Sequence, residues 1–165
     1  MYILGIDPGT AIMGYGLIDK QGNRLIPLTY ASWRTPADLP MPERLLMLYR
    51  EMTAFIQTYQ PAQVAVEELF FNRNTTTAIS VGQARGVILL AAAQAGIPVY
   101  EYTPLQVKQA VVGYGKADKK QVQQMVRALL GLNEVTKPDD TADALAIAIC
   151  DAHSVNLLNR MEGTR

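Results

Sequence analysis

The sequence predicts a mixed α/β fold in which five strands form one sheet and helices cover both of its faces. Two observations lead to this fold class. Three strand-like segments follow one another at the start of the chain, and the remainder alternates between short apolar strands and helices with an apolar face. At 165 residues, 49% of them hydrophobic, the chain is long enough for one well-filled core and too short for two. We therefore expect a single domain over residues 1–158 and a short tail, 159–165, that frays.

Apolar spacing and turn residues give the boundaries of the expected elements. The strands are expected at residues 2–7, 14–19, 24–34, 64–67 and 98–102. A turn at residues 20–23 separates the second strand from the third, so the first three strands form a meander. The helices are expected at residues 43–59, 77–94, 104–112, 118–130 and 140–158.

The composition also narrows the functional class. The chain has no secretory signal pattern and no uninterrupted apolar run long enough to span a membrane, so we expect a cytoplasmic protein. Its one cysteine, Cys150, excludes an internal disulfide and a cysteine-rich zinc site.

Charge is distributed unevenly along the chain, although the formal net charge is zero. Residues 73–127 contain only two acidic side chains, and their basic side chains are Arg73, Arg85, Lys108, Lys116, Lys119, Lys120 and Arg127. A basic middle segment is typical of proteins that neutralise phosphates. An ordinary solvated surface is the alternative for this feature taken alone.

Four acidic residues stand where strands end or a helix begins. Asp7 ends the first apolar strand, Glu67 ends the fourth, and Asp140 and Asp143 are one turn apart at the start of the last helix. Carboxylates gathered in one cleft repel one another unless a cation is present, and Mg²⁺, or Mn²⁺ in its place, prefers such oxygen ligands. The expected chemistry is phosphodiester hydrolysis with two metal ions in each site.

Each acid also has an ordinary structural explanation. Asp7 precedes Pro-Gly and can start a turn. Asp139 or Asp140 can cap the last helix, which would make Asp143 a first-turn acid. Glu67 and Glu68 are adjacent, so only one of them enters a cleft, and periodicity does not say which.

Several motifs, in order along residues 2–155, resemble the RuvC family of Holliday junction resolvases. These are residues 3–9 (ILGIDPG), 65–67 (AVE), 82–86 (GQARG), 106–109 (QVKQ) with 112–113 (VG), and 140–146 (DTADALA). The resemblance implies a ribonuclease H-like fold and a homodimeric, Mg²⁺-dependent endonuclease that nicks two opposed strands of four-way junction DNA at symmetric positions. It implies that Asp7, Glu67, Asp140 and Asp143 are the metal-binding and catalytic residues, with Glu67 chosen over Glu68. It further implies a role in recombination and repair alongside the RuvA and RuvB branch-migration proteins.

The resemblance also implies a set of DNA-binding residues. Phe70 and Arg73 match positions that contact junction DNA in the family, and Lys108 and Lys119 match basic positions near the scissile phosphate. Lys116 and Lys120 are expected to contact the DNA backbone or to be plain surface charges. Of Phe70 and Phe71, we expect Phe70 to meet DNA and the other to join the core.

The helix over residues 78–95 is apolar nearly all round, which favours burial against both the sheet and a second subunit, with burial in the core alone as the alternative. His153, the one histidine, is expected to be structural.

Other functions stay open. The Gly5–Thr10 segment also resembles the phosphate loop of the actin and sugar-kinase ATPases. The same fold can also serve a nuclease acting on RNA or a junction-binding module without catalysis.

Overall fold

Five strands form one mixed sheet in the order β3–β2–β1–β4–β5. The computed structural model describes the backbone of residues 1–68 and 75–162 and the side chains of residues 1–68 and 77–155. The strands are β1 (Tyr2–Asp7), β2 (Ile12–Gln21), β3 (Arg24–Arg34), β4 (Gln63–Glu67) and β5 (Val99–Tyr102). The β1, β2 and β3 strands form an antiparallel meander, and β4 and β5 continue the sheet parallel to β1. The expected mixed sheet is confirmed.

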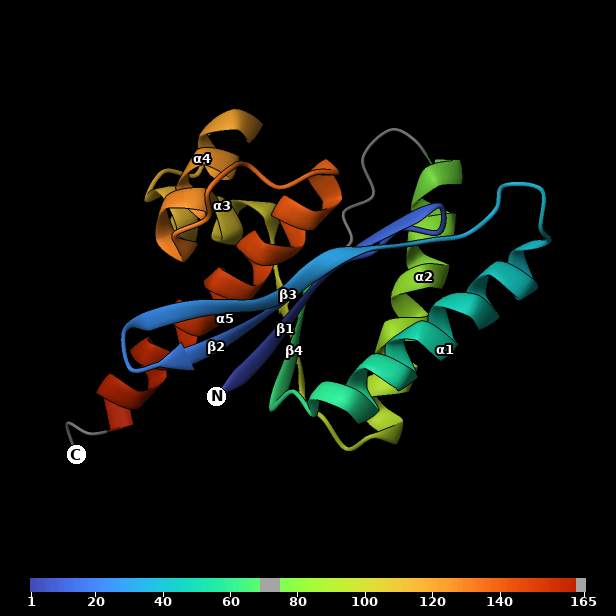
Figure 1. Ribbon diagram of the computed structural model, residues 1–165, viewed down its shortest axis with the longest axis horizontal. Helices are drawn as coiled ribbons and strands as arrows, with labels where there is room; N and C mark the ends of the chain where they lie inside the picture. The colour runs from blue at the N-terminus through green and yellow to red at the C-terminus, as the bar shows by residue number, and fades with distance from the viewer. Residues whose placement is uncertain (69–74, 163–165) are drawn as a thin grey trace.

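Helices cover both faces of this sheet (Figure 1). One face carries α1 (Met41–Tyr59) and α2 (Thr75–Gln94), and the other carries α3 (Pro104–Val112), α4 (Lys119–Leu130) and α5 (Asp139–Glu162). The expected end of the last helix at residue 158 is wrong, because α5 continues to Glu162. Residues 155–162 contain no glycine or proline, so nothing in the sequence stops the helix before Gly163. Within residues 1–68 and 75–162, no helix has the length and apolar character to cross a membrane.

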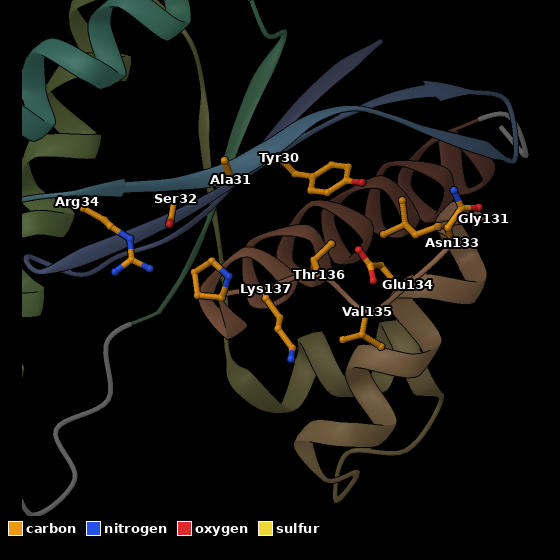
Figure 2. A pocket seen from close by; sticks show the side chains of 12 residues that line it. Tyr30, Ala31, Ser32, Arg34, Gly131, Asn133, Glu134, Val135, Thr136 and Lys137 are labelled. Carbon is orange, nitrogen blue, oxygen red and sulfur yellow. The ribbon is translucent and has the colours of Figure 1, made fainter.

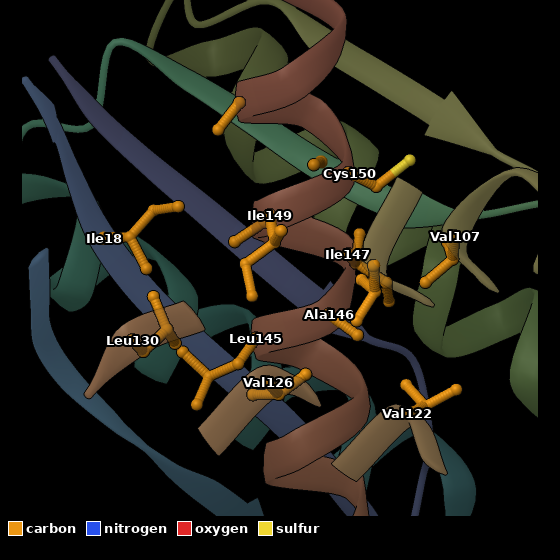
Figure 3. Packing of buried hydrophobic residues seen from close by; sticks show 14 of the residues in the cluster. Ile18, Val107, Val122, Val126, Leu130, Leu145, Ala146, Ile147, Ile149 and Cys150 are labelled. Atoms are coloured by element: carbon orange, nitrogen blue, oxygen red, sulfur yellow. The ribbon is translucent and has the colours of Figure 1, made fainter. Parts of the chain in front are cut away.

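The central strands are buried on both sides because they contribute to two separate cores. On the α5 face, Ile3 and Ala65 join apolar side chains of α3, α4 and α5. Figure 3 shows part of this core, including Val107, Val126 and Ile147. On the opposite face, Leu4, Ile6 and Val66 pack against α1 and α2. This double burial explains why β1 and β4 read as continuous apolar runs rather than as alternating ones.

The α5 helix packs unusually close to β1 and β2 because glycines face it. A Cβ atom at Gly5 would collide with the backbone oxygen of Ala144 and lie 2.7 Å from the backbone nitrogen of Ala148. A Cβ atom at Gly14 would collide with the backbone of Asp140. These contacts set the depth at which the first turns of α5 lie over the sheet.

We expect Gly5→Ala to lower the free energy of unfolding by about 1–3 kcal/mol, because the added methyl group meets helix backbone that must shift. Urea unfolding followed by circular dichroism measures the change. Adding Ala148→Gly is not expected to restore stability, because the nearest obstacles at Gly5 are backbone atoms. Rescue by that second change would show that side-chain crowding, rather than backbone approach, limits this packing.

Candidate functional site

Three acidic side chains from three different elements line one pocket of about 230 Å³. Asp7 is the last residue of β1, Glu67 is the last residue of β4, and Asp143 lies near the start of α5. Because β1 and β4 are parallel neighbours with Ile6 opposite Val66, the residues that follow this pair emerge at the same edge of the sheet. The tertiary structure therefore gathers acids that are far apart in the sequence.

The structure distinguishes Glu67 from Glu68. Glu67 is half-buried and lines the pocket, whereas Glu68 is exposed and its backbone N–H donates to the Tyr102 carbonyl oxygen at 2.8 Å. The alternation of side chains along a strand sends the two glutamates in different directions.

Asp140 lies beside this pocket without lining it. It is half-buried, and its backbone rests against Gly14 of β2. The capping alternative is wrong for both aspartates, because the helix already begins at Asp139 and the residue before it is Pro138. The Thr141 N–H donates to the Pro138 carbonyl oxygen at 3.0 Å.

The pocket disfavours the ionised form of its carboxyl groups. Burial, and next the charges of Asp143, Glu67 and Asp140, raise the pKa of Asp7 to about 8. Burial likewise raises the pKa of Glu67 and of Asp143 above the usual range. A carboxyl group so perturbed by burial and like charges is a mark of a functional site. A bound cation would relieve this repulsion.

Lys119 is the main cation at the pocket in the described structure. Its Nζ lies 3.1 Å from Asp143 Oδ2 and 3.3 Å from Asp139 Oδ2. Burial opposes the charge, but the two carboxylates raise the pKa of Lys119 above its usual value. Lys119 is the first residue of α4, a helix opened by a capping box between Asp118 and Gln121. A cation is unfavourable at a helix N-terminus, so the acids of α5, rather than its own helix, stabilise Lys119 there.

Lys108 reaches the same pocket from α3. That helix is opened by a capping box between Thr103 and Gln106, which orients the turn that carries Lys108. The charge of Lys108 lowers the pKa of Glu67 against the larger effect of burial. Two lysines and three acids therefore share one small volume.

Other residues singled out in the sequence do not line the pocket or lie outside the described structure. Lys116 and Lys120 are exposed and are not among the pocket residues. Phe70, Phe71 and Arg73 lie outside the described residues. The His153 ring is half-buried and its Nδ1–H donates to the Ala110 carbonyl oxygen at 3.0 Å, away from the acids.

The sequence did not reveal the apolar wall of the pocket. It consists of Pro104, Val107, Val122, Ala146 and Ile147. Their helical spacing marks them only as core positions, because a residue at the rim of a core has the same spacing as one inside it. The contact of Asp139 with Lys119 was missed for a related reason: the two residues belong to different helices, and no sequence rule pairs them.

The residue types at the pocket suit a hard divalent cation, although the side chains are not drawn together into a finished cage. Among the described side chains of residues 1–68 and 77–155, no three His, Cys, Asp or Glu are grouped closely enough to hold an ion. The donors are nevertheless all carboxylate oxygens, and their electrostatic repulsion favours a cation. A cation bound by Asp143 would have to displace Lys119 from it.

Comparison with known proteins identifies the family of this chain. The family model described as crossover junction endodeoxyribonuclease RuvC matches residues 3–151. The chain belongs to the RuvC family. A RuvC relative described as a crossover junction endodeoxyribonuclease, from Desulfitobacterium hafniense (strain DSM 10664 / DCB-2), is 82% identical over 99% of both chains. The solved structure of Thermus thermophilus RuvC is 40% identical, with a TM-score of 0.89 over 95% of this chain and 96% of the other. A second structure of that RuvC, in complex with Holliday junction substrate, has a TM-score of 0.90 with the same identity and coverage.

Membership of the RuvC family confirms the ribonuclease H-like fold that the sequence resemblance implied. It also means that the chain is a member of a family of metal-dependent nucleases. The acidic pocket gathers Asp7, Glu67 and Asp143, three of the four acids that the sequence resemblance singled out, and the raised pKa of Asp7 favours a cation there.

The raised pKa of Asp7 predicts how the stability of the metal-free protein depends on pH. Its folded-state pKa of about 8 exceeds the model value of 3.8, so the folded state holds a proton that the unfolded chain has lost. The free energy of unfolding therefore falls as the pH rises from about 4 towards 8, by up to about 1.4 kcal/mol per pH unit from this group.

Urea unfolding of the chelator-treated protein between pH 6 and pH 8 measures this dependence. Asp7→Asn should flatten it, and Asp38→Asn, which changes an exposed aspartate, should leave it unchanged. An equal pH dependence in wild type and Asp7→Asn would contradict the assignment of the shift to Asp7.

Proposed function

We propose that this protein is a structure-selective endonuclease that resolves four-way (Holliday) DNA junctions by paired, symmetric nicks during recombination and repair. One observation carries the proposal: a chain of the RuvC family, matched over residues 3–151, gathers Asp7, Glu67 and Asp143 in one pocket with two lysines. Relatives are described as crossover junction endodeoxyribonucleases, and one RuvC structure contains a Holliday junction substrate. The acids give the hydrolytic site, and the lysines give it an affinity for phosphate.

In this proposal, Asp7, Glu67, Asp140 and Asp143 hold two Mg²⁺ ions in each active site, with Mn²⁺ as a substitute. The bound ions supply activation of the attacking water and stabilisation of the departing 3′ oxygen. The chain's own residues position the reaction: β1 and β4 fix the spacing of Asp7 and Glu67, and α5 brings its acids over them. The apolar wall around Val107 and Val122 limits the access of water.

Lys119 and Lys108 act on the substrate phosphate. Lys119 Nζ lies 3.1 Å from Asp143 Oδ2, so a metal ion held by Asp143 would displace the Lys119 ammonium and leave it available to the scissile phosphodiester. Lys108 faces the same volume from α3 and neutralises charge on the other side of the pocket. Proposed contacts to the bases and the backbone of the junction remain Phe70, Arg73, Lys116 and Lys120.

We also propose that the protein acts in the cytoplasm.

We expect Asp7→Asn to retain junction binding and to lower the nicking rate by about two orders of magnitude or more, because it removes a charged ligand from the site. Gel shift measures binding, and cleavage of an end-labelled four-way junction in Mg²⁺ measures nicking. Asp38→Asn is the matched control, because it makes the same change at an exposed carboxylate remote in sequence from the four acids.

Linear duplex and an RNA–DNA hybrid run in parallel test junction selectivity. Undiminished nicking by Asp7→Asn would contradict the metal-site assignment. Efficient cleavage of the hybrid with no junction preference would favour a ribonuclease, and ATP hydrolysis without nicking would favour the kinase-like alternative.

The exposed face of α2 supports a homodimer. Ile79 is 61% exposed and Leu90 is 55% exposed, and they lie three turns apart on one side of the helix with exposed Gln83 and Gly86 between them. The opposite side, with Ala84 and Ile88, is buried against α1 and the sheet. Two large exposed apolar side chains on one side of a helix fit an isologous contact with a second copy, which would also supply the two active sites that paired nicks require. RuvA and RuvB remain proposed partners of this dimer.

We expect Leu90→Glu to shift the protein from dimer to monomer, because two glutamates would be buried at a two-fold contact. Sedimentation velocity measures the change. Leu46→Glu is the matched control, because Leu46 is 45% exposed on the neighbouring helix α1 and lies outside the proposed contact. A dimer that persists in Leu90→Glu at micromolar concentration would place the contact elsewhere.

A further inference from the structure

A second hollow, of about 670 Å³, lies between the end of β3 and the segment that precedes α5. We refer to it as the edge groove. Figure 2 shows the side chains that define it: Tyr30, Ser32 and Arg34 from β3, and Glu134, Thr136 and Lys137 from the facing segment. None of these residues belongs to the acidic pocket.

The edge groove adjoins the start of α5 from the side opposite the acidic pocket. Trp33 packs with Tyr15 and Phe55 in the core beneath α1, so its neighbours Ser32 and Arg34 point to the α5 face of the sheet. Ser32 pairs with Gly14, and Gly14 touches the backbone of Asp140. Because β2 lies between β3 and β1, the groove and the strand-end acids flank the first turns of α5.

The edge groove carries an excess of positive charge. Arg34 and Lys137 are exposed, and neither forms an ion pair within the described part of the chain. Glu134 is the one acidic side chain in the lining. In Figure 2 it lies towards Tyr30, while Arg34 and Ser32 lie at the other end. Within the lining, the end of the groove that carries Arg34 is therefore the more basic one.

A buried hydroxyl group in the groove lining lacks a partner. Thr136 is only 8% exposed, and its Oγ1 has no hydrogen-bond partner in the described structure. A buried polar group in this state is unusual and costs stability. Because Thr136 Oγ1 has no hydrogen bond to lose, turning this hydroxyl group towards a ligand in the groove would break no hydrogen bond. Arginine, lysine and hydroxyl groups together match the oxygens of a phosphate.

We propose that the edge groove binds a backbone phosphate of the DNA substrate, held by Arg34, Lys137 and the Thr136 hydroxyl. The inference rests on the proposed junction-cleaving function and adds a contact to it. An extended peptide added to the free edge of β3 is the rival occupant, but two unpaired cations and the nearby active site favour DNA.

The salt dependence of junction binding tests the charge contacts. Each lost phosphate contact reduces the slope of log K against log salt concentration by about 0.9, so the double variant Arg34→Gln/Lys137→Gln, which loses one phosphate contact, should reduce the slope by about 0.9. Arg24→Gln is the matched control, because Arg24 is an exposed arginine at the opposite end of the same strand. An unchanged salt slope in the double variant would overturn the proposal and favour the peptide as the occupant of the groove.

Thr136→Val separates ligand binding from folding. The substitution preserves shape and removes the unpartnered hydroxyl, so the melting temperature should stay the same or rise while junction binding weakens about three- to tenfold. A lower melting temperature with unchanged binding would show that the hydroxyl is structural and would overturn its assigned role. Nicking by the wild-type protein reports on the proposed function separately: an enzyme that nicks junctions but shows neither effect refutes only the edge groove.

Discussion

The close approach of α5 to β1 and β2 is the constraint on which the rest of the structure depends. At Gly5 and Gly14 the strand backbone leaves no room for a Cβ atom, so the helix backbone itself lies on the sheet. This depth brings Asp143 to the sheet edge where Asp7 and Glu67 emerge. A helix held farther away by ordinary side chains would carry the same residues without assembling a site, because carboxylates must converge within a few ångströms to share an ion.

The gathering of these acids in one pocket has an electrostatic cost, and Lys108 and Lys119 line the same pocket. Burial and neighbouring carboxylates raise the pKa of Asp7 to about 8, and Lys119 offsets part of the repulsion by contacting Asp143 and Asp139. The same repulsion favours a cation at this site. The exposed Ile79 and Leu90 on α2 and the basic edge groove are the surfaces that we propose for a second copy and for DNA.

Much of the fold could be predicted from the sequence because its signals are local. The Pro-Gly after Asp7, the continuous apolar runs of β1 and β4 and the amphipathic α4 predicted the element order, and the motifs of residues 3–9 and 140–146 predicted the family. Boundaries were less certain: α5 runs to Glu162, beyond the predicted end, because helix-favouring residues continue past the last clear apolar spacing. The roles proposed for Phe70 and Arg73 lie outside the described residues and rest on the sequence alone.

By itself, the sequence determined which chemical groups this protein has: four acids at element ends, a basic middle segment and the motifs of a nuclease family. Only the tertiary structure decided how they meet. Because of strand alternation and the β1–β4 register, the side chain of Glu67, and not that of Glu68, points into the pocket. Packing between α4 and α5 places Lys119 beside its acidic partners. The physical reason is that residue chemistry and periodicity are local properties, whereas a distance between residues more than a hundred positions apart depends on the packing of the whole sheet and its helices.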